Sequence, residues 1–212
     1  MADIDAKTVM KLRGATGAGM MDCKKALEES GGDFDKARDW LRLKGAKTAE
    51  KKAGRAATAG YVGSYLHHNG RLGVMVEVMC ESDFVAMNDK FKDFVRKIAM
   101  HIAAANPAPM CIRREEVPAD LVAHERSIYE QQVLDKPVQI RAKIAEGKLN
   151  AFFKERVLLE QIWSMSEGGP ERTVEQTLKE MIGVIGENMV LRRFARFDVS
   201  DAVADTAGGE AS

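Results

Sequence analysis

The feature that most restricts the fold is a change in hydrophobic period near residue 60. Apolar residues recur at helical spacing before it, whereas residues 61–67 and 71–80 form two β-rich runs around the dipeptide Asn69-Gly70. Asn-Gly favours a type I′ turn, because both central positions of that turn need a positive φ. The pattern therefore predicts a β-hairpin and excludes a purely helical protein.

Three short helices are expected on the N-terminal side of this change. Apolar residues recur at helical spacing over 4–13, 20–30 and 33–45, and glycines separate these segments. Three short helices so close together predict a small bundle, which we place at residues 1–45. The residues expected to hold the bundle together are Leu27, Trp40 and Leu41.

A stretch rich in Lys and Ala follows the bundle. It contains few large apolar residues, and over residues 42–55 basic side chains far outnumber the one acidic residue, Glu50. We expect residues 46–57 to form an exposed helical linker with a solvated charged face. Contact between this basic face and an acidic partner is the alternative interpretation.

Amphipathic helices and a final strand are expected beyond the hairpin. Apolar positions line a helix over 88–105 that Asn88 can cap, and further helical patterns cover 118–135 and 137–160. The segment 188–199 alternates apolar and polar residues, as a half-buried strand does.

The fold class that follows is α+β. The bundle and linker precede residues 58–199, where the hairpin and the final strand form an antiparallel three-stranded sheet packed with helices. Three strands with one covered face can be stable where a lone hairpin is not. Residues 200–212 are small and acidic, and we expect them to be disordered.

Charge and composition exclude several classes of protein. The 212 residues carry 32 basic and 32 acidic side chains, so no net field recruits nucleic acid or an anionic membrane. The apolar runs are shorter than the ~18 residues typical of a membrane span. Cys23, Cys80 and Cys111 have no metal-binding spacing and indicate reduced thiols in a cytoplasmic protein.

No motif of catalytic chemistry occurs in the sequence. P-loop, HExxH and GxSxG patterns are absent, and the glycines at 14–19 follow a helix rather than a strand, which argues against dinucleotide binding. We therefore expect a protein that is not an enzyme, holds no cofactor or metal, and binds no nucleotide directly.

The corner at Asp83-Phe84 is unusual, because an acid and a large ring stand between a strand and a helix. Ser82 can cap a turn over 83–87, and Asn88 can cap the helix that follows. Two caps so close together predict a short helical knob. On residue type alone, a Phe favours burial in the local core over exposure, so the pattern leaves the position of this ring open.

Four segments carry a resemblance to a known family. They are LRGATGAGMMDCKKAL at 12–27, CESDFVA at 80–86, the central region 136–161, and IGENMVLRRF at 185–194. The chain resembles the short bacterial form of elongation factor Ts, the guanine nucleotide exchange factor of elongation factor Tu. It departs from the family at Ser82, where Thr is usual, and at Met87, a position that is often basic.

The resemblance implies a translation elongation factor of the cytoplasm. It implies that the bundle has a ubiquitin-associated-type fold that binds the GTPase domain of elongation factor Tu, and that the Asp83-Phe84 knob promotes GDP release by displacing the Mg²⁺ region. It also implies a homodimer. The residues implied for the bundle contact are Met20, Met21 and Lys24, and those implied for the knob are Asp83, Phe84, Val85, Ala86 and Met87.

Two other classes of function remain open from the sequence. One is a protein–protein adaptor, which would bind a partner without releasing GDP. The other is a ribosome- or RNA-associated protein that uses the basic run at 42–55. The neutral net charge and the lack of a stacking-aromatic strand pattern argue against RNA.

Overall fold

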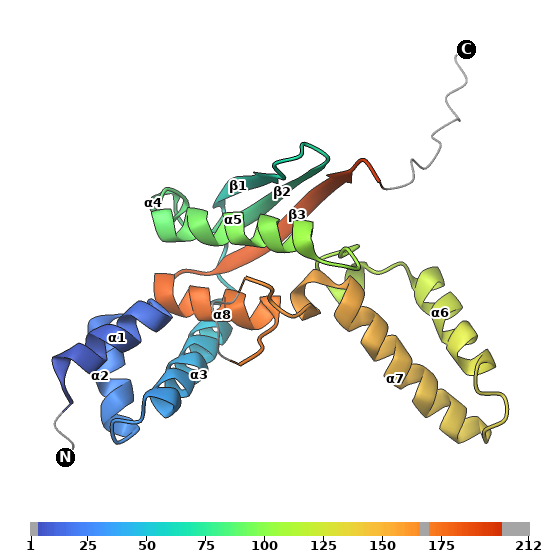
Figure 1. Ribbon diagram of the computed structural model, residues 1–212, viewed down its shortest axis with the longest axis horizontal. Helices are drawn as coiled ribbons and strands as arrows, with labels where there is room; N and C mark the ends of the chain where they lie inside the picture. The colour runs from blue at the N-terminus through green and yellow to red at the C-terminus, as the bar shows by residue number, and fades with distance from the viewer. Residues whose placement is uncertain (1–3, 166–169, 201–212) are drawn as a thin grey trace, which may run out of the picture.

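The computed structural model describes residues 4–165 and 170–200 and has the α+β architecture expected from the sequence (Figure 1). The expected disordered tail falls on 201–212, outside the described residues, apart from Ser200. In the part of the chain that the structure describes, no helix is long and apolar enough to cross a membrane.

The N-terminal bundle consists of α1 (Ala6–Thr16), α2 (Met20–Glu29) and the first half of α3 (Phe34–Lys52). Gly17 ends α1 with a φ of 68°, a left-handed conformation that glycine adopts without strain. Asp33 caps α3 by accepting from the backbone N–H groups of residues 35 and 36. The expected core is confirmed, since buried and half-buried residues pack together as one cluster, which we call the bundle core: Val9, Leu12, Cys23, Ala26, Leu27, Ala37, Trp40 and Leu41.

Helix α3 differs from the sequence prediction at its C-terminal half. A helix ending near Gly45 and an exposed linker over 46–57 were expected, but α3 continues to Lys52 and Ala49 is only 4% exposed. The physical reason is a close crossing with α8 (Val174–Ile185), where Gly45 lies against the backbone of Glu180. This half of α3 therefore packs on the rest of the protein.

The predicted three-stranded antiparallel sheet is confirmed. It contains β1 (Ala59–Leu66), β2 (Leu72–Cys80) and β3 (Met189–Asp198), in that spatial order. The hairpin is present, but its turn is not the expected type I′: Gly70 has a φ of 68°, whereas no described residue other than glycine has a positive φ, so Asn69 lacks the conformation that this turn needs. The Gly70 N–H instead donates to the carbonyl of His67 at 2.8 Å, which closes a longer loop. The register pairs Gly63 with Val76 and Val76 with Phe194, so alternate residues face the same side of the sheet.

Helix α5 (Asp89–Ala104) covers one face of this sheet (Figure 1). It approaches so closely that a Cβ on Gly63 would lie 2.7 Å from a methyl group of Val95. The buried valines of β2, the apolar face of α5, parts of α8 and Ala49 form a second cluster, the main core. The opposite face of the sheet exposes large apolar side chains, namely Val62, Leu66, Met75 and Phe197.

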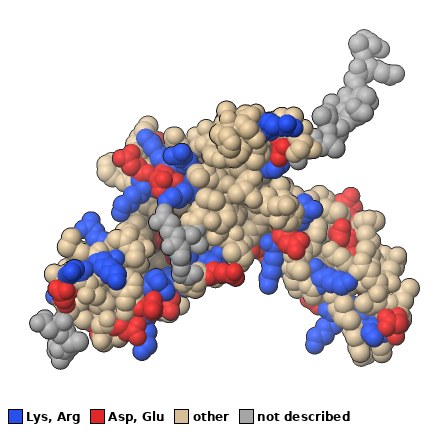
Figure 2. Space-filling view, viewed as in Figure 1, with Lys and Arg blue, Asp and Glu red and all other residues tan. Residues whose placement is uncertain are grey.

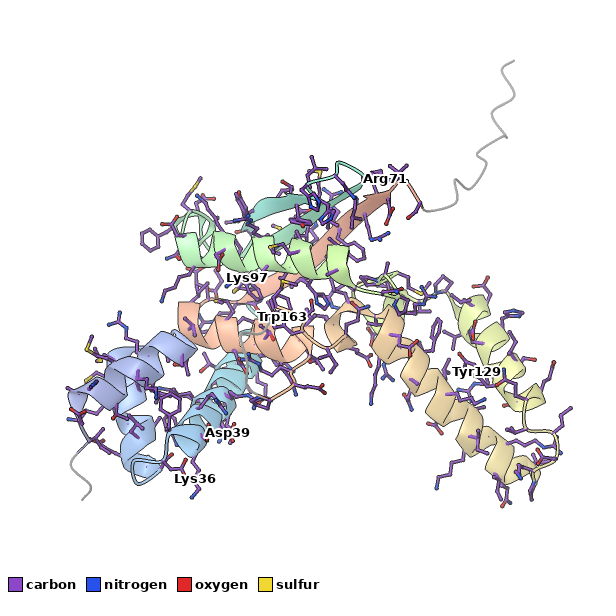
Figure 3. The ribbon with its side chains drawn as sticks, viewed as in Figure 1. Lys36, Asp39, Arg71, Lys97, Tyr129 and Trp163 are labelled. Carbon is purple, nitrogen blue, oxygen red and sulfur yellow. The ribbon has the colours of Figure 1, made fainter. Side chains whose placement is uncertain are left out.

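Trp163 lies between α5 and α8 (Figure 3). Its ring stacks on His101 of α5 with ring centroids 5.3 Å apart. The imidazole is buried, with Nε2 3.1 Å from Gln161 Oε1 and Nδ1 2.9 Å from Ser164 Oγ. This polar cluster ties the segment before α8 to the helix that covers the sheet.

Helices α6 (Ala119–Gln131) and α7 (Val138–Arg156) form a hairpin that projects away from the bundle (Figure 1). Tyr129 lies between the two helices (Figure 3). Two short 3₁₀ helices, Arg114–Glu116 and Leu158–Glu160, flank the hairpin. Helix α7 stops before residue 160, where the sequence predicted its end, because Val157 forms a bridge with Cys111.

Candidate functional site

The corner between β2 and α5 is a single helical turn, α4 (Asp83–Ala86). The Ser82 hydroxyl oxygen accepts from the N–H of Val85 at 3.3 Å, and Asn88 Oδ1 accepts from the N–H of Lys90 at 2.9 Å. Both predicted caps are therefore present. The two caps fix the start of α4 and the start of α5, and together they define a short knob.

The knob presents some of its side chains to solvent and buries others. Phe84 is 83% exposed, and Asp83 and Met87 are exposed beside it. Val85 and Ala86 are buried in the main core at 5% and 4%. The structure thus resolves the question that residue type left open, because the ring points outward while its two neighbours hold the turn in place.

Residues of the α8–β3 connection support the knob from beneath. The Glu187 carboxylate accepts from the Ser82 hydroxyl at 2.6 Å and from the Ser82 N–H at 3.0 Å. The next residue, Asn188, donates its N–H to Glu81 Oε1 at 2.6 Å and its Nδ2 to the carbonyl of Arg55 at 2.8 Å. We call the five residues joined by these bonds the knob base: Arg55, Glu81, Ser82, Glu187 and Asn188.

The electrostatics of the knob base favour an ionised carboxylate at Glu81. The backbone N–H of Asn188 holds the pKa of this carboxyl below its usual value, and the Arg55 guanidinium, 3.5 Å away, acts in the same direction. Cys80 lies directly before Glu81, and burial raises the pKa of its thiol. This cysteine is therefore a buried thiol that donates to the Ser82 carbonyl at 3.3 Å, not a nucleophile.

The second group of predicted site residues lies on α2. Cys23, Ala26 and Leu27 face the bundle core, so the intervening residues of this helix point outward. Met20 and Met21 are exposed, Met21 at 74%, and Lys24 forms only a loose pair with Glu28 at 3.8 Å. Flexible thioethers beside an exposed, loosely paired cation suit contact with another protein.

The two groups do not merge into one patch, since they lie on different elements. The bundle and α4 nevertheless stand at the same end of the molecule, on the left of the view in Figure 1. Figure 2 shows acidic and basic side chains interspersed over this face, without a large area of one sign. We refer to the exposed residues of α2 as the bundle surface and to Asp83, Phe84 and Met87 as the knob surface.

Sequence reasoning did not identify Glu81, Glu187 and Asn188 as functional candidates. The available signal was the segment IGENMVLRRF, which contains two of them and was used only as a mark of resemblance. Their role depends on contacts between segments more than a hundred residues apart. Among the described residues, no cluster of three or more His, Cys, Asp or Glu side chains could hold a metal ion.

An exposed ring on a fixed corner and exposed methionines on α2 are the two candidate contact surfaces of this α+β protein. A family model described as "Elongation factor TS" matches residues 46–170. The chain is 53% identical over 203 residues to "Elongation factor Ts" of Citrifermentans bemidjiense, covering 95% of this chain and 92% of that protein. The chain belongs to the elongation factor Ts family and is a translation elongation factor.

Other relatives support the same assignment across nearly the whole chain. The protein named elongation factor Ts of Geobacter sulfurreducens is 54% identical over 202 residues, covering 94% of this chain and 91% of the relative. That of Solidesulfovibrio magneticus is 49% identical over 203 residues, covering 95% of this chain and 99% of the relative. The similarity thus extends over both the bundle and the core.

Proposed function

We propose that this chain binds elongation factor Tu in its GDP-bound form and accelerates release of the GDP. The observation that carries the proposal is the 83% exposure of Phe84 on a turn that is held by buried neighbours and by the knob base. Membership of the elongation factor Ts family supports elongation factor Tu as the partner. The exposed ring supports insertion into that partner as the way in which GDP is released. The chain would act in the cytoplasm, and it would not catalyse a chemical reaction.

The physical argument concerns the magnesium ion of the partner. Mg²⁺ ties the phosphates of a bound nucleotide to a GTPase through a few ligands in strict geometry. A ring inserted between helices near that site displaces ligands, which weakens nucleotide binding without any reacting group on the exchange factor. By linkage, rebinding of a nucleotide weakens the complex by the same factor.

The knob surface is suited to such an insertion. Burying a ring of this size in a partner stabilises the complex by about 1.5–3 kcal/mol, and the free protein gains none of this. The buried side chains of Val85 and Ala86 hold the turn in place, so that it would not shift when the ring enters the partner. Asp83 and Met87 would contact the rim of the pocket, while Val85 and Ala86 support the ring from within.

The bundle surface supplies a second contact in this proposal. Met20 and Met21 would pack on the GTPase domain, and Lys24 would face acidic side chains there. Their exposure in the free chain and their place on the outer face of α2 support this assignment. This contact would contribute affinity, whereas the knob surface would release the nucleotide.

We further propose that two copies of the chain pair through the uncovered face of the sheet. Val62, Leu66, Met75 and Phe197 are all more than half exposed on this face. Exposed large apolar side chains gathered on one face of a sheet often mark an interface, and the Glu77–Arg193 ion pair on the same face would lie beside them. Pairing would leave the knob surface and the bundle surface of both copies free.

Stopped-flow fluorescence tests the proposal. Elongation factor Tu loaded with fluorescent GDP is mixed with excess unlabelled GDP, with and without this chain. Faster loss of signal that grows with the concentration of the chain is the expected result. Binding without faster release would favour the adaptor, and salt-dependent binding to ribosomal RNA without binding to Tu would favour the RNA-associated alternative.

A further inference from the structure

Helix α3 belongs to both hydrophobic cores. Ala37, Trp40 and Leu41 of its first half pack in the bundle core, and Ala49 of its second half packs in the main core. The two cores are separate clusters. The placement of the bundle on the rest of the protein therefore depends on how α3 is held.

The crossing of α3 with α8 is unusually close. A Cβ added to Gly183 of α8 would lie 2.6 Å from the Cα of Gly45 on α3, which is less than any real contact. Neither helix can move toward the other, and any side chain at position 183 would push them apart. The absence of a side chain at Gly183 thus permits this distance between the helices, whereas a Cβ on Gly45 would make only ordinary contact, 3.5 Å from the Cα of Glu180.

Ion pairs fix the orientation at the same crossing. Glu180 of α8 accepts from Nε of Arg42 on α3 at 2.9 Å and from the Arg172 guanidinium at 2.7 Å. All three side chains are mostly buried. A cleft of about 110 Å³ adjoins the crossing and is lined partly by Gly45, Glu180 and Gly183. The junction thus combines the glycine contact and the ion pairs with the apolar packing of Ala49 in the main core.

The far end of α3 reaches the knob base. Lys52 donates to the carbonyl oxygen of Gly186, and Asn188 donates to the carbonyl of Arg55 at 2.8 Å. Asn188 also binds Glu81, directly before the knob. Helix α3 therefore connects the bundle, which carries the bundle surface, to the knob base beneath Phe84.

We propose that the α3–α8 crossing is a positioning device that holds the bundle surface and the knob surface at a fixed separation, so that one partner molecule meets both together. Arg42, Gly45, Glu180 and Gly183 are its positioning residues. The inference rests on the proposed function. Its physical basis is that two linked contacts reinforce each other only when their geometry allows simultaneous binding, and a rigid link maximises that effect.

The substitution Gly183→Leu tests this inference, because a side chain there separates the helices without touching either surface. We measure the acceleration of GDP release from elongation factor Tu at subsaturating concentrations of the variant and of the unsubstituted chain. The acceleration by the variant should be at least about tenfold smaller. Far-UV circular dichroism should stay helical, and small-angle X-ray scattering should report a changed shape. Gly147→Leu is the matched control, since a Cβ at this helical position meets nothing within 4 Å.

A second variant keeps the test decisive if Gly183→Leu does not fold. Glu180→Gln removes the charge that both arginines share while keeping the side-chain size, and we expect about two- to fivefold slower release. If Gly183→Leu folds and accelerates GDP release fully, the inference is wrong. If Gly183→Leu does not fold, full acceleration by Glu180→Gln contradicts it in the same way. Either result leaves the proposed function standing. No acceleration by the unsubstituted chain would overturn the proposed function as well.

Discussion

Ser82 and Glu187 are joined by two hydrogen bonds, although they are 105 residues apart in the chain. The carboxylate accepts from the Ser82 hydroxyl at 2.6 Å and from its backbone N–H at 3.0 Å. The same hydroxyl oxygen caps α4 by accepting from the N–H of Val85. The direction in which Phe84 points is therefore set by a residue of the α8–β3 connection.

Removal of this support should weaken exchange without removing the ring. Glu187→Ala leaves two donors of Ser82 without their acceptor, which we expect to lower the free energy of unfolding by about 1–2 kcal/mol. GDP release should slow by roughly tenfold, because a looser knob loses part of its fixed geometry. Stopped-flow release and thermal unfolding measure the two effects. Glu146→Ala, an exposed change on α7, is the control, and unchanged exchange by Glu187→Ala would remove Glu187 from the positioning of the knob.

The sequence was sufficient to predict features set by neighbouring residues. The hairpin at Asn69-Gly70, the caps at Ser82 and Asn88, and the α+β class follow from local turn and cap chemistry together with hydrophobic period. The final strand was also predicted, because alternation is a local pattern.

Features that depend on distant pairs were not predictable in this way. The Ser82–Glu187 contact and the approach of Gly45 to Gly183 join segments with no pattern in common. The same limit explains why α3 was expected to end early, because its second half is stabilised by α8 rather than by its own composition. Residue type alone favoured burial of Phe84, whereas its exposure was expected from the family resemblance and is confirmed by the structure.

Lys24→Ala should weaken the complex with elongation factor Tu and leave stability nearly unchanged. The side chain is about half exposed, and its pair with Glu28 is the weak i, i+4 kind worth about 0.3–0.5 kcal/mol. We expect a three- to tenfold higher Kd, roughly as for a rim charge, and a weaker dependence of Kd on salt. Titration calorimetry at two salt concentrations measures both. Lys36→Ala is the control, and a large fall in melting temperature would make Lys24 structural instead.

Phe197→Glu should dissociate the proposed homodimer. Phe197 is 71% exposed on the uncovered face of the sheet, and a charge in the centre of an apolar interface costs several kcal/mol when it is unpaired. Sedimentation equilibrium at micromolar concentration should give a dimer for the unsubstituted chain and a monomer for the variant. Val138→Glu, an equally exposed change on α7, should leave the dimer intact. A monomeric unsubstituted chain would contradict the proposal.

Stability should fall as the pH decreases below neutrality because of His101. Gln161 donates its side-chain N–H to the carbonyls of Pro107 and Glu155, so its oxygen accepts from Nε2–H of His101. Nδ1 accepts from the N–H of Ser164, which defines a neutral imidazole. Burial lowers the pKa of His101 below its usual value of 6.5.

The sign of this effect follows from proton binding. A histidine whose folded-state pKa is lowered binds fewer protons in the folded than in the unfolded state between the two pKa values. The unfolded state is therefore favoured as the pH falls through about 6.5, the unfolded pKa, toward the folded value. Melting temperatures from pH 8 to 5 should fall less steeply in His101→Gln than in the unsubstituted chain. His124→Gln, an exposed change, should keep the original slope, and equal slopes in all three proteins would contradict the assignment.

Phe84→Ala separates the exchange function of the knob from its contribution to folding. Buried aromatic residues at protein interfaces often cost about 2–4 kcal/mol when truncated. At about 1.4 kcal/mol per tenfold change, the loss of exchange should be about 30- to several-hundred-fold. Because the ring is 83% exposed in the free chain, the free energy of unfolding should change by about 1 kcal/mol or less. Leu134→Ala, an exposed apolar change near α7, should alter neither quantity.

The stopped-flow rate of GDP release from elongation factor Tu with the Phe84→Ala variant is the most direct test of the central claim. The claim predicts that the variant keeps the melting temperature of the unsubstituted chain and loses nearly all of its acceleration of GDP release. Fast release by the variant, accompanied by a large fall in melting temperature, would show that Phe84 stabilises the fold and does not act on the partner.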